Sequence, residues 1–154
     1  YKLLGYKAVD LIQFYLVNPE AQQNILVYPE NFPLATATVG CASLKLMCSK
    51  DLETLNLPGG SVFSWKTPRY FIQRFIRHPF YTYKVYGIVK DRKIWAIIAS
   101  RVVQHKGSVV LRIVDFIGDI NVLADCGSAF HNLMIECFAE YMDFWQRDLC
   151  PFGL

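Results

Sequence analysis

The sequence predicts an α+β fold in which a mixed, mainly antiparallel sheet is flanked by helices. Strand-like runs follow one another between residues 83 and 119, separated only by short polar breaks. A helix-like segment precedes them at 67–79, and another follows at about 128–140. The chain has 154 residues, of which 53% are hydrophobic and 19% charged. That composition supports a substantial core and argues against a disordered chain.

The central runs predict an antiparallel meander. Residues 85–89 are rich in β-branched and aromatic side chains, as strands are. Residues 94–103 are almost wholly apolar, which is typical of a strand buried on both faces. The third run covers 109–117. Polar breaks at 90–93 and 104–107 separate the runs, and the glycine that ends the second break can adopt a positive φ. We therefore expect short hairpin loops there.

The first helix begins at Thr67 and Pro68. Threonine is a good N-cap, and proline at the first helical position loses no hydrogen bond. Pro79 ends the helix, because it forces His78 out of the α region. An apolar stripe at helical spacing is formed by Phe71, Ile72, Phe75 and Ile76.

The second helix is expected at about 128–140 and is followed by a strand at 141–145. Its expected buried side consists of Ala129, Phe130, Leu133, Met134, Cys137 and Phe138.

The first third of the chain is less clearly patterned. Residues 6–17 are expected to form a strand that stops at Asn18-Pro19. Residues 34–47 are ambiguous, because β-branched residues in their first half favour a strand whereas 42–47 also fit a helix. A short helical turn is expected at 51–57.

This order of elements, with the residues that fill it, resembles the GNAT superfamily of N-acetyltransferases. More narrowly, it resembles the second half of two-lobed GNAT-like acyltransferases of bacterial sugar and polysaccharide pathways. The likeness rests on the segments KTPRYFIQRFIRHPFYTYKVYGI, LRIVDFIGD, and AEYMDFWQRDL followed by PFGL. The opening, YKLLGYKAVDLIQFYLVNP, is similar to the final strands of a preceding GNAT lobe.

The resemblance implies a division of the chain into three parts. Residues 1–30 correspond to the terminal strands of a preceding GNAT-like lobe, 31–61 to a linker region and 62–154 to the second lobe. The clearest linker sequence is LPGGS at 57–61. Because the chain begins at Tyr1 inside an apparent element, we expect it to be a fragment of a longer protein.

The resemblance also implies a function. The chain would be part of an N-acyltransferase that moves an acyl group from acyl-CoA to an amine, with an amino sugar or nucleotide sugar as the candidate acceptor. GNAT enzymes hold the CoA pyrophosphate on an Arg/Gln-x-x-Gly-x-Gly/Ala loop before a helix, where backbone N–H groups converge. The corresponding segment here, 119–128, has Gly127 but no Gly-x-Gly, no basic residue and two carboxylates, Asp119 and Asp125.

We therefore expect no cofactor to bind this lobe, and acetyl-CoA or another acyl-CoA to serve as co-substrate of the full-length protein. The alternative is a non-catalytic GNAT-like binding or interaction module, which the missing glycine loop favours.

Five residues are candidate substrate contacts: His78, Tyr83, Arg112, Asp115 and Asp143. His78 and the tyrosines after it can line a sugar-binding cleft by stacking and hydrogen bonding. In the alternative interpretation, His78 caps the helix and the rings pack in the core. The sequence identifies no catalytic residue.

Alternation along the strand 109–117 places Asp115 on one face with Leu111 and Ile113, and Arg112 on the opposite face. A carboxylate on an apolar face needs a partner. Asp115, and likewise Asp143, would therefore bind either a substrate amine or hydroxyl, or the backbone N–H groups of a loop.

Charge and cysteine content constrain the partners. The net charge is +3, and residues 66–93 carry eight basic residues and one acidic residue. Such a cluster attracts anions or forms a solvated face. Five cysteines without a C-x-x-C pair, and histidines without ligand spacing, predict no metal site. The apolar runs are too short to span a bilayer, and no signal-like segment opens the chain, so we expect a cytoplasmic protein.

The expected partner is a small molecule, with no nucleic acid. A nucleic-acid binder that uses the basic helix and its aromatic residues is the third hypothesis.

Overall fold

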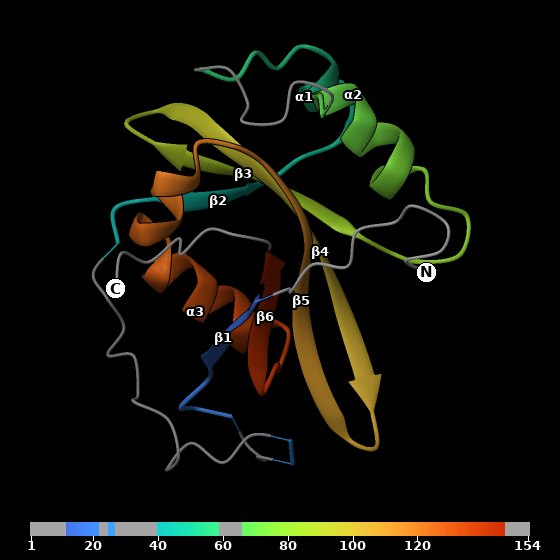
Figure 1. Cartoon of the computed structure of the whole chain (residues 1–154), viewed down its shortest axis with the longest axis vertical. Coiled ribbons are helices and arrows are strands. Elements are labelled where there is room, and N and C mark those ends of the chain that lie inside the picture. Colours follow the sequence, from blue (N-terminus) through green and yellow to red (C-terminus); the bar gives the residue numbers. More distant parts are fainter. Residues whose placement is uncertain (1–11, 22–24, 27–39, 59–65, 147–154) are drawn as a thin grey trace, which may run out of the picture.

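The computed structural model describes residues 12–21, 25–26, 40–58 and 66–146 (Figure 1). Within these ranges six strands form one sheet, in the order β1-β6-β5-β4-β3-β2. Only β5 and β6 run parallel; the other neighbours are antiparallel. The predicted mixed, mainly antiparallel sheet is thus confirmed. The strands are β1 (Ile12–Val17), β2 (Ser43–Leu46), β3 (Lys84–Lys90), β4 (Lys93–His105), β5 (Ser108–Gly118) and β6 (Tyr141–Gln146).

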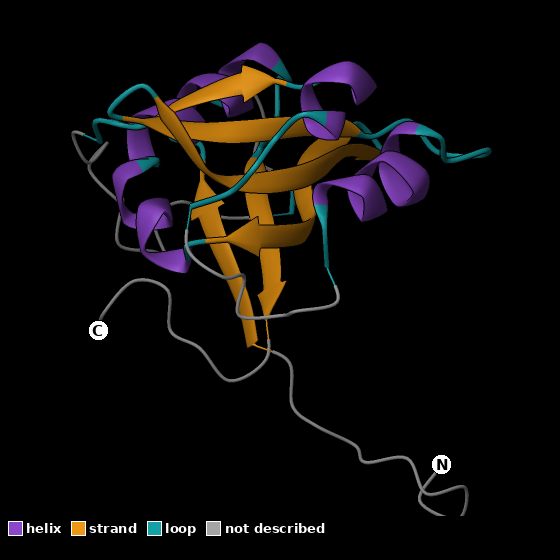
Figure 2. Ribbon diagram, turned by 90° about the horizontal axis from the view of Figure 1, so that it is seen from above, coloured by secondary structure: helices purple, strands orange, loops and turns teal. Residues whose placement is uncertain are grey.

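Helices cover both faces of the sheet (Figure 2). On one face lie α1 (Ser49–Glu53) and α2 (Pro68–Phe71), which continues directly into the π-helical segment η3 (Ile72–Ile76). On the other face lie the 3-10 segment η4 (Ile120–Asp125) and α3 (Gly127–Glu136). We call these the α2 face and the α3 face. The long β4–β5 hairpin extends away from α1 and α2 (Figure 1).

The predicted meander of β3, β4 and β5 is confirmed. The loops between these strands are Asp91-Arg92 and Lys106-Gly107, and all four residues have positive φ, at 50°, 62°, 49° and 89°. Positive φ at both central residues is the geometry of a type I′ turn, whose twist matches that of the flanking strands. A glycine in the second turn meets this requirement without steric cost.

The apolar run in β4 is buried on both faces, as its composition predicts. Ala96 and Ile98 join the core on the α3 face, whereas Ile97 and Ala99 join the core on the α2 face. All four are at most 1% exposed. β4 therefore contributes side chains to both cores.

The first predicted helix begins and buries its stripe as expected. The Thr67 hydroxyl accepts a hydrogen bond from the Tyr70 amide at 3.3 Å. Phe71, Ile72 and Phe75 are 0%, 2% and 6% exposed. The second half of the helix is π-helical rather than α-helical, because the Arg77 amide bonds the Ile72 carbonyl at 2.9 Å.

The second predicted helix is shorter than its pattern indicates. α3 ends at Glu136, and Phe138 has a φ of 55° and is 76% exposed. The prediction that Phe138 packs in the core is therefore wrong, because the chain reverses there to enter β6. Cys137 and Ala129 are half-buried. The fully buried positions of the helix are Phe130, Leu133 and Met134.

Two further predictions are resolved in the first third of the chain. The ambiguous segment forms a strand, β2, at 43–46, so the helical alternative for 42–47 is wrong; residues 34–39 lie outside the described ranges. The short helix near residue 51 exists, but it begins at Ser49 and ends at Glu53. The strand predicted at 6–17 is described from Ile12 onward.

All three predicted parts of the chain contribute to the same sheet. β1 pairs with β6, and β2 pairs with β3. Asn18 ends β1 and is 2% exposed; its amide group donates to the Ala139 carbonyl at 2.8 Å, and its backbone N–H donates to the Glu140 carbonyl at 2.9 Å. The assignment of these parts to separate lobes remains a prediction.

In the part of the chain that the structure describes, none of the helices is long and apolar enough to cross a membrane.

Candidate functional site

A β-bulge corrects the predicted facing of Arg112 and Asp115. The β4–β5 register shifts between Ala99 and Ser100, which leaves Val114 as an extra residue. Leu111 and Ile113 therefore pack on the α3 face, whereas Ile117 packs on the α2 face. A bulge moves every residue beyond it to the opposite face. The prediction that Arg112 and Asp115 lie on opposite faces is thus wrong, and both lie on the α2 face.

Asp143 is a buried carboxylate that holds Arg112. Asp143 is 1% exposed, and Arg112 donates to it from Nε at 2.9 Å and from Nη2 at 2.7 Å. These hydrogen bonds raise the pKa of the Arg112 guanidinium. Two further donors reach the same carboxylate, the Gln13 side-chain amide at 3.1 Å and the Trp145 ring N–H at 3.3 Å. A bidentate pair of this kind fixes the plane of the guanidinium.

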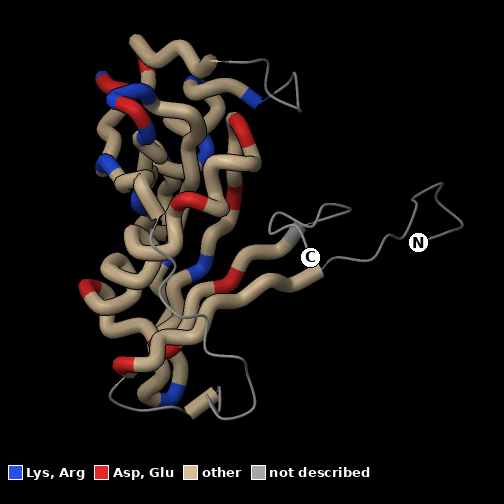
Figure 3. Tube along the Cα trace, turned by 90° about the vertical axis from the view of Figure 1, so that its left-hand side faces the viewer, with Lys and Arg blue, Asp and Glu red and all other residues tan. Residues whose placement is uncertain are grey.

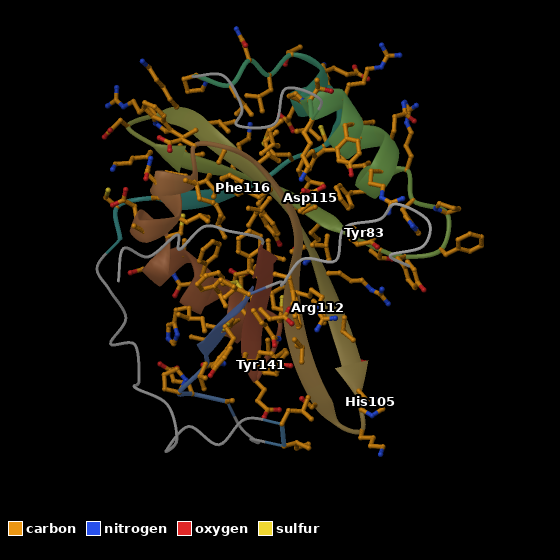
Figure 4. The ribbon with its side chains drawn as sticks, viewed as in Figure 1. Tyr83, His105, Arg112, Asp115, Phe116 and Tyr141 are labelled. Carbon is orange, nitrogen blue, oxygen red and sulfur yellow. The ribbon has the colours of Figure 1, made fainter. Side chains whose placement is uncertain are left out.

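These residues belong to a row that crosses four strands. Tyr15 of β1 is the register partner of Asp143, which pairs with Arg112, which pairs with Arg101 of β4. We call these four residues the cross-strand row. Tyr15 is 45% exposed, and the Arg112 side chain is 42% exposed. Figure 4 shows Arg112 near the middle of the sheet, between Tyr83 and Tyr141.

Aromatic rings border the row at the end of η3. The Arg101 guanidinium carbon lies 3.8 Å from the centre of the Tyr81 ring. His78 stacks on Tyr81 and meets Tyr83 edge-on, with ring centres 5.2 Å apart in both pairs. His78 Nδ1 accepts hydrogen bonds from the Phe80 and Tyr81 amides at 3.2 and 3.0 Å. The proton of the neutral imidazole is therefore assigned to Nε2.

Asp115 lies on the same face but is already paired. It forms an ion pair with Lys66, and both side chains are at most 15% exposed. Burial, followed by the charge of Asp115 and a hydrogen bond to it, raises the pKa of Tyr70. Asp115 thus joins β5 to the start of α2.

Four of the five predicted contacts therefore fall into two groups. Arg112 and Asp143 are in direct contact, and His78 and Tyr83 are in contact beside Arg101. Asp115 stands apart from both groups, in its pair with Lys66. Their substrate role remains a prediction.

The sequence interpretation missed Arg101, Tyr15, Gln13 and Trp145. Arg101 carried a usable signal. A two-residue turn at Lys106-Gly107 pairs His105 with Ser108, and counting back equally along both strands reaches Arg101 and Arg112. The residues from β1 and β6 carried no such signal, because those strands are distant in sequence.

The start of α3 does not have the form of a phosphate-binding loop. Residues 120–125 form the 3-10 segment η4, and the Gly40 backbone packs against the junction with α3. A Cβ added to Gly40 would lie 1.9 Å from the Asp125 carbonyl oxygen and 3.2 Å from the Gly127 nitrogen. The Ala42 amide donates to the same carbonyl at 3.2 Å. Another segment of the chain therefore covers this helix terminus.

The basic cluster is partly neutralised. In Figure 3 most Lys and Arg residues lie in the upper half of the molecule, with Asp and Glu interspersed among them. Lys66 pairs with Asp115, and Lys90 pairs with Asp125 at 2.5 Å. No group of three His, Cys, Asp or Glu residues in the described ranges is placed to hold a metal ion.

The arrangement of elements is similar to that of a solved structure, a GCN5-related N-acetyltransferase from Anabaena variabilis. The TM-score is 0.52 at 12% sequence identity, and the match covers 92% of this chain but 34% of that one. No protein-family model matches the sequence. A comparison with curated proteins also gave no match. At this identity the likeness shows the fold alone: the chain has a GNAT-like α+β fold, as its sequence predicts.

Proposed function

We propose that this chain is the acceptor-binding lobe of a GNAT-like N-acyltransferase, which transfers an acyl group from acyl-CoA to an amine. The observation that carries the proposal lies on the α2 face, where the buried Asp143 orients Arg112. The strand neighbour of Arg112, Arg101, lies on the Tyr81 ring, which contacts His78 and Tyr83. Polar groups fixed by buried partners, next to half-buried aromatic rings, are typical of small-molecule sites. An amino sugar or nucleotide sugar is the acceptor class that suits stacking rings and polar donors best.

The residues have distinct roles in this proposal. Tyr83 and His78 form a wall against which an acceptor ring stacks, and Arg112 donates hydrogen bonds to it. Asp143 positions Arg112 rather than contacting the acceptor, because its carboxylate is buried and already accepts from Gln13 and Trp145 as well. Asp115 joins β5 to α2 through Lys66.

The acyl-CoA is held outside this lobe. A pyrophosphate site needs converging backbone N–H groups at a helix start. Here the segment before α3 is a 3-10 helix that carries Asp125, and the Gly40 backbone packs against the first residue of α3. These features support the expectation, drawn from the sequence pattern, that this lobe has no CoA-binding loop.

The chemistry is direct transfer. The amine nitrogen attacks the thioester carbon, the new N–C bond forms as the C–S bond breaks, and the proton lost from nitrogen ends on the CoA thiolate. A base and an oxyanion donor lower the barrier of such a step. We assign neither role to a residue of this lobe, because Asp115 and Asp143 are both paired and His78 Nδ1 already accepts from two amides.

A transfer assay tests the proposal. The protein that contains this lobe is mixed with acetyl-CoA and, in separate reactions, amino sugars, nucleotide-linked amino sugars and amino acids. Thiol release and mass spectrometry then report acylated amine. We expect transfer to one acceptor class, with a raised KM for His78→Ala and an unchanged KM for the exposed control Arg69→Gln.

The covered start of α3 also favours a second candidate, a non-catalytic binding module. The same reactions separate the two candidates. If none of these compounds is acylated, but one of them still shifts the NMR resonances of Tyr83 and Arg112 in a titration, the chain is a non-catalytic binding module.

A further inference from the structure

We propose that Arg101 and Arg112 form a subsite for an oxyanion, a carboxylate or phosphate group carried by the bound small molecule. The identification of that molecule as the acyl acceptor rests on the proposed function; the subsite itself rests on the geometry of β4 and β5.

Two like charges lie side by side on β4 and β5. Arg101 and Arg112 are direct register partners on the same face of an antiparallel pair. Side chains at such positions are near neighbours, and like charges there are destabilising. Asp143 compensates Arg112, but Arg101 forms no ion pair with any residue in the described ranges. The pair therefore carries an excess positive charge that an anion would neutralise.

Both arginines keep N–H groups that bond no described residue. Arg112 uses Nε and Nη2 on Asp143, and its Nη1 makes no hydrogen bond to another described residue. Arg101 lies over the Tyr81 ring, and stacking leaves the N–H groups at the edge of a guanidinium unused. Two guanidinium groups thus present donors from adjacent strands. Planar forks of this kind match the paired oxygens of a carboxylate or phosphate.

Both guanidinium groups are held in place without being enclosed. Asp143 fixes Arg112 through two hydrogen bonds, and the Tyr81 ring, itself stacked on His78, supports Arg101. The Arg112 side chain remains 42% exposed. An oriented guanidinium loses little conformational entropy when a ligand binds. It therefore binds an anion more favourably than a mobile surface lysine would.

Matched sugars provide the test. Galactose, galacturonate and galactose 6-phosphate share one ring and differ in a neutral, carboxylate or phosphate group. Each is titrated into the ¹⁵N-labelled chain at constant ionic strength, and the arginine Nε–H resonances are followed. We expect the Arg101 and Arg112 signals to shift with one or both acids and not with galactose. The acid that binds with the lower Kd identifies the preferred oxyanion as a carboxylate or a phosphate.

Variants make the result specific. Arg101→Gln keeps the Arg112–Asp143 pair intact, and it should weaken binding of the preferred acid at least about tenfold, as loss of a charge-assisted hydrogen bond does. Arg69→Gln removes an exposed arginine of α2 outside the cross-strand row and should leave binding unchanged. Arg112→Gln alone leaves a buried carboxylate without its cation, so the second variant is Arg112→Gln combined with Asp143→Asn.

Three outcomes would overturn the inference: equal binding of galactose and both acids, no shift with any of them, or an equal loss in Arg101→Gln and Arg69→Gln. The last result would indicate a diffuse field rather than a site. If the transfer assay fails but the chain still binds the acid in an Arg101-dependent way, only the proposed function is refuted. Acyl transfer that shows no preference for anionic acceptors would remove only the subsite.

Discussion

Phe75 and Phe80 lie in the same aromatic-rich segment, but only one of them is buried. Phe75 is 6% exposed, and its ring centre is 5.2 Å from those of both Phe71 and Tyr83. Phe80 follows Pro79 and is 86% exposed. The helical stripe distinguishes them, because Phe75 lies on the face that packs on the sheet and Phe80 lies beyond the helix end.

Replacing Phe75 with alanine should therefore destabilise the protein by about 3–5 kcal/mol, the range for truncating a buried phenylalanine. Phe80→Ala should change the free energy of unfolding by no more than about 0.5 kcal/mol. Urea unfolding of both variants measures the difference. Equal losses would show that the stripe does not pack as described.

Among the elements, α1 carries a carboxylate, Asp51, that bonds back to the N-cap residue Cys48. Hydrogen bonds from the thiol and the backbone N–H of Cys48, and then Lys45, lower the pKa of Asp51 from 3.8 to about 2. A lowered pKa means that the folded state favours the charged form. The resulting stability is present in full above the unfolded value of 3.8 and is lost as the pH falls through about 2.

Asp51→Asn should consequently be less stable than the natural chain at about pH 6, and the gap should narrow at about pH 2.5. Unfolding curves at both pH values check this. A gap that stays constant, or that widens in acid, would contradict the assigned role. Glu53→Gln, at an exposed position of the same helix, is the control.

Asn18 anchors the edge strand β1 to the start of β6. Its buried side chain donates to Ala139 at 2.8 Å and accepts from the Glu20 amide at 3.0 Å. Asn18→Ala should cost about 1–3 kcal/mol, because a buried carbonyl loses its donor. Hydrogen exchange should quicken in β1 but not in β3. Uniform acceleration across the sheet would instead indicate global destabilisation.

For the molecule as a whole, the covered terminus of α3 predicts weak binding of acetyl-CoA. The basic residues of 66–93 lie in other elements, so they supply a diffuse field that salt screens. Calorimetric titration of the chain with acetyl-CoA should show no site with a low-micromolar Kd. Such a Kd would correspond to a binding free energy of about −8 kcal/mol. Any weak binding should vanish at high salt. A low-micromolar Kd that persists there would make this lobe a catalytic candidate.

Local patterns in the sequence determined most of the fold. Thr67-Pro68, the apolar stripe after it and the two-residue turns depend on neighbours within a few positions, so capping, periodicity and turn chemistry predict them. The two-residue turn at Lys106-Gly107 also sets the strand register that pairs Arg101 with Arg112. The GNAT-like order of elements follows from these segments.

Long-range packing decided the rest. The bulge at Val114 places Asp115 on the face of Arg112, and strict alternation along one strand cannot show a shift that depends on its partner. Asp143 acquires Gln13 and Arg112 as partners only when β1 and β5 lie on either side of β6. Gly40 covers the start of α3 through a contact between segments distant in sequence. Residue type and spacing thus specify the elements, whereas the site is formed by strand pairings whose partners only the folded chain selects.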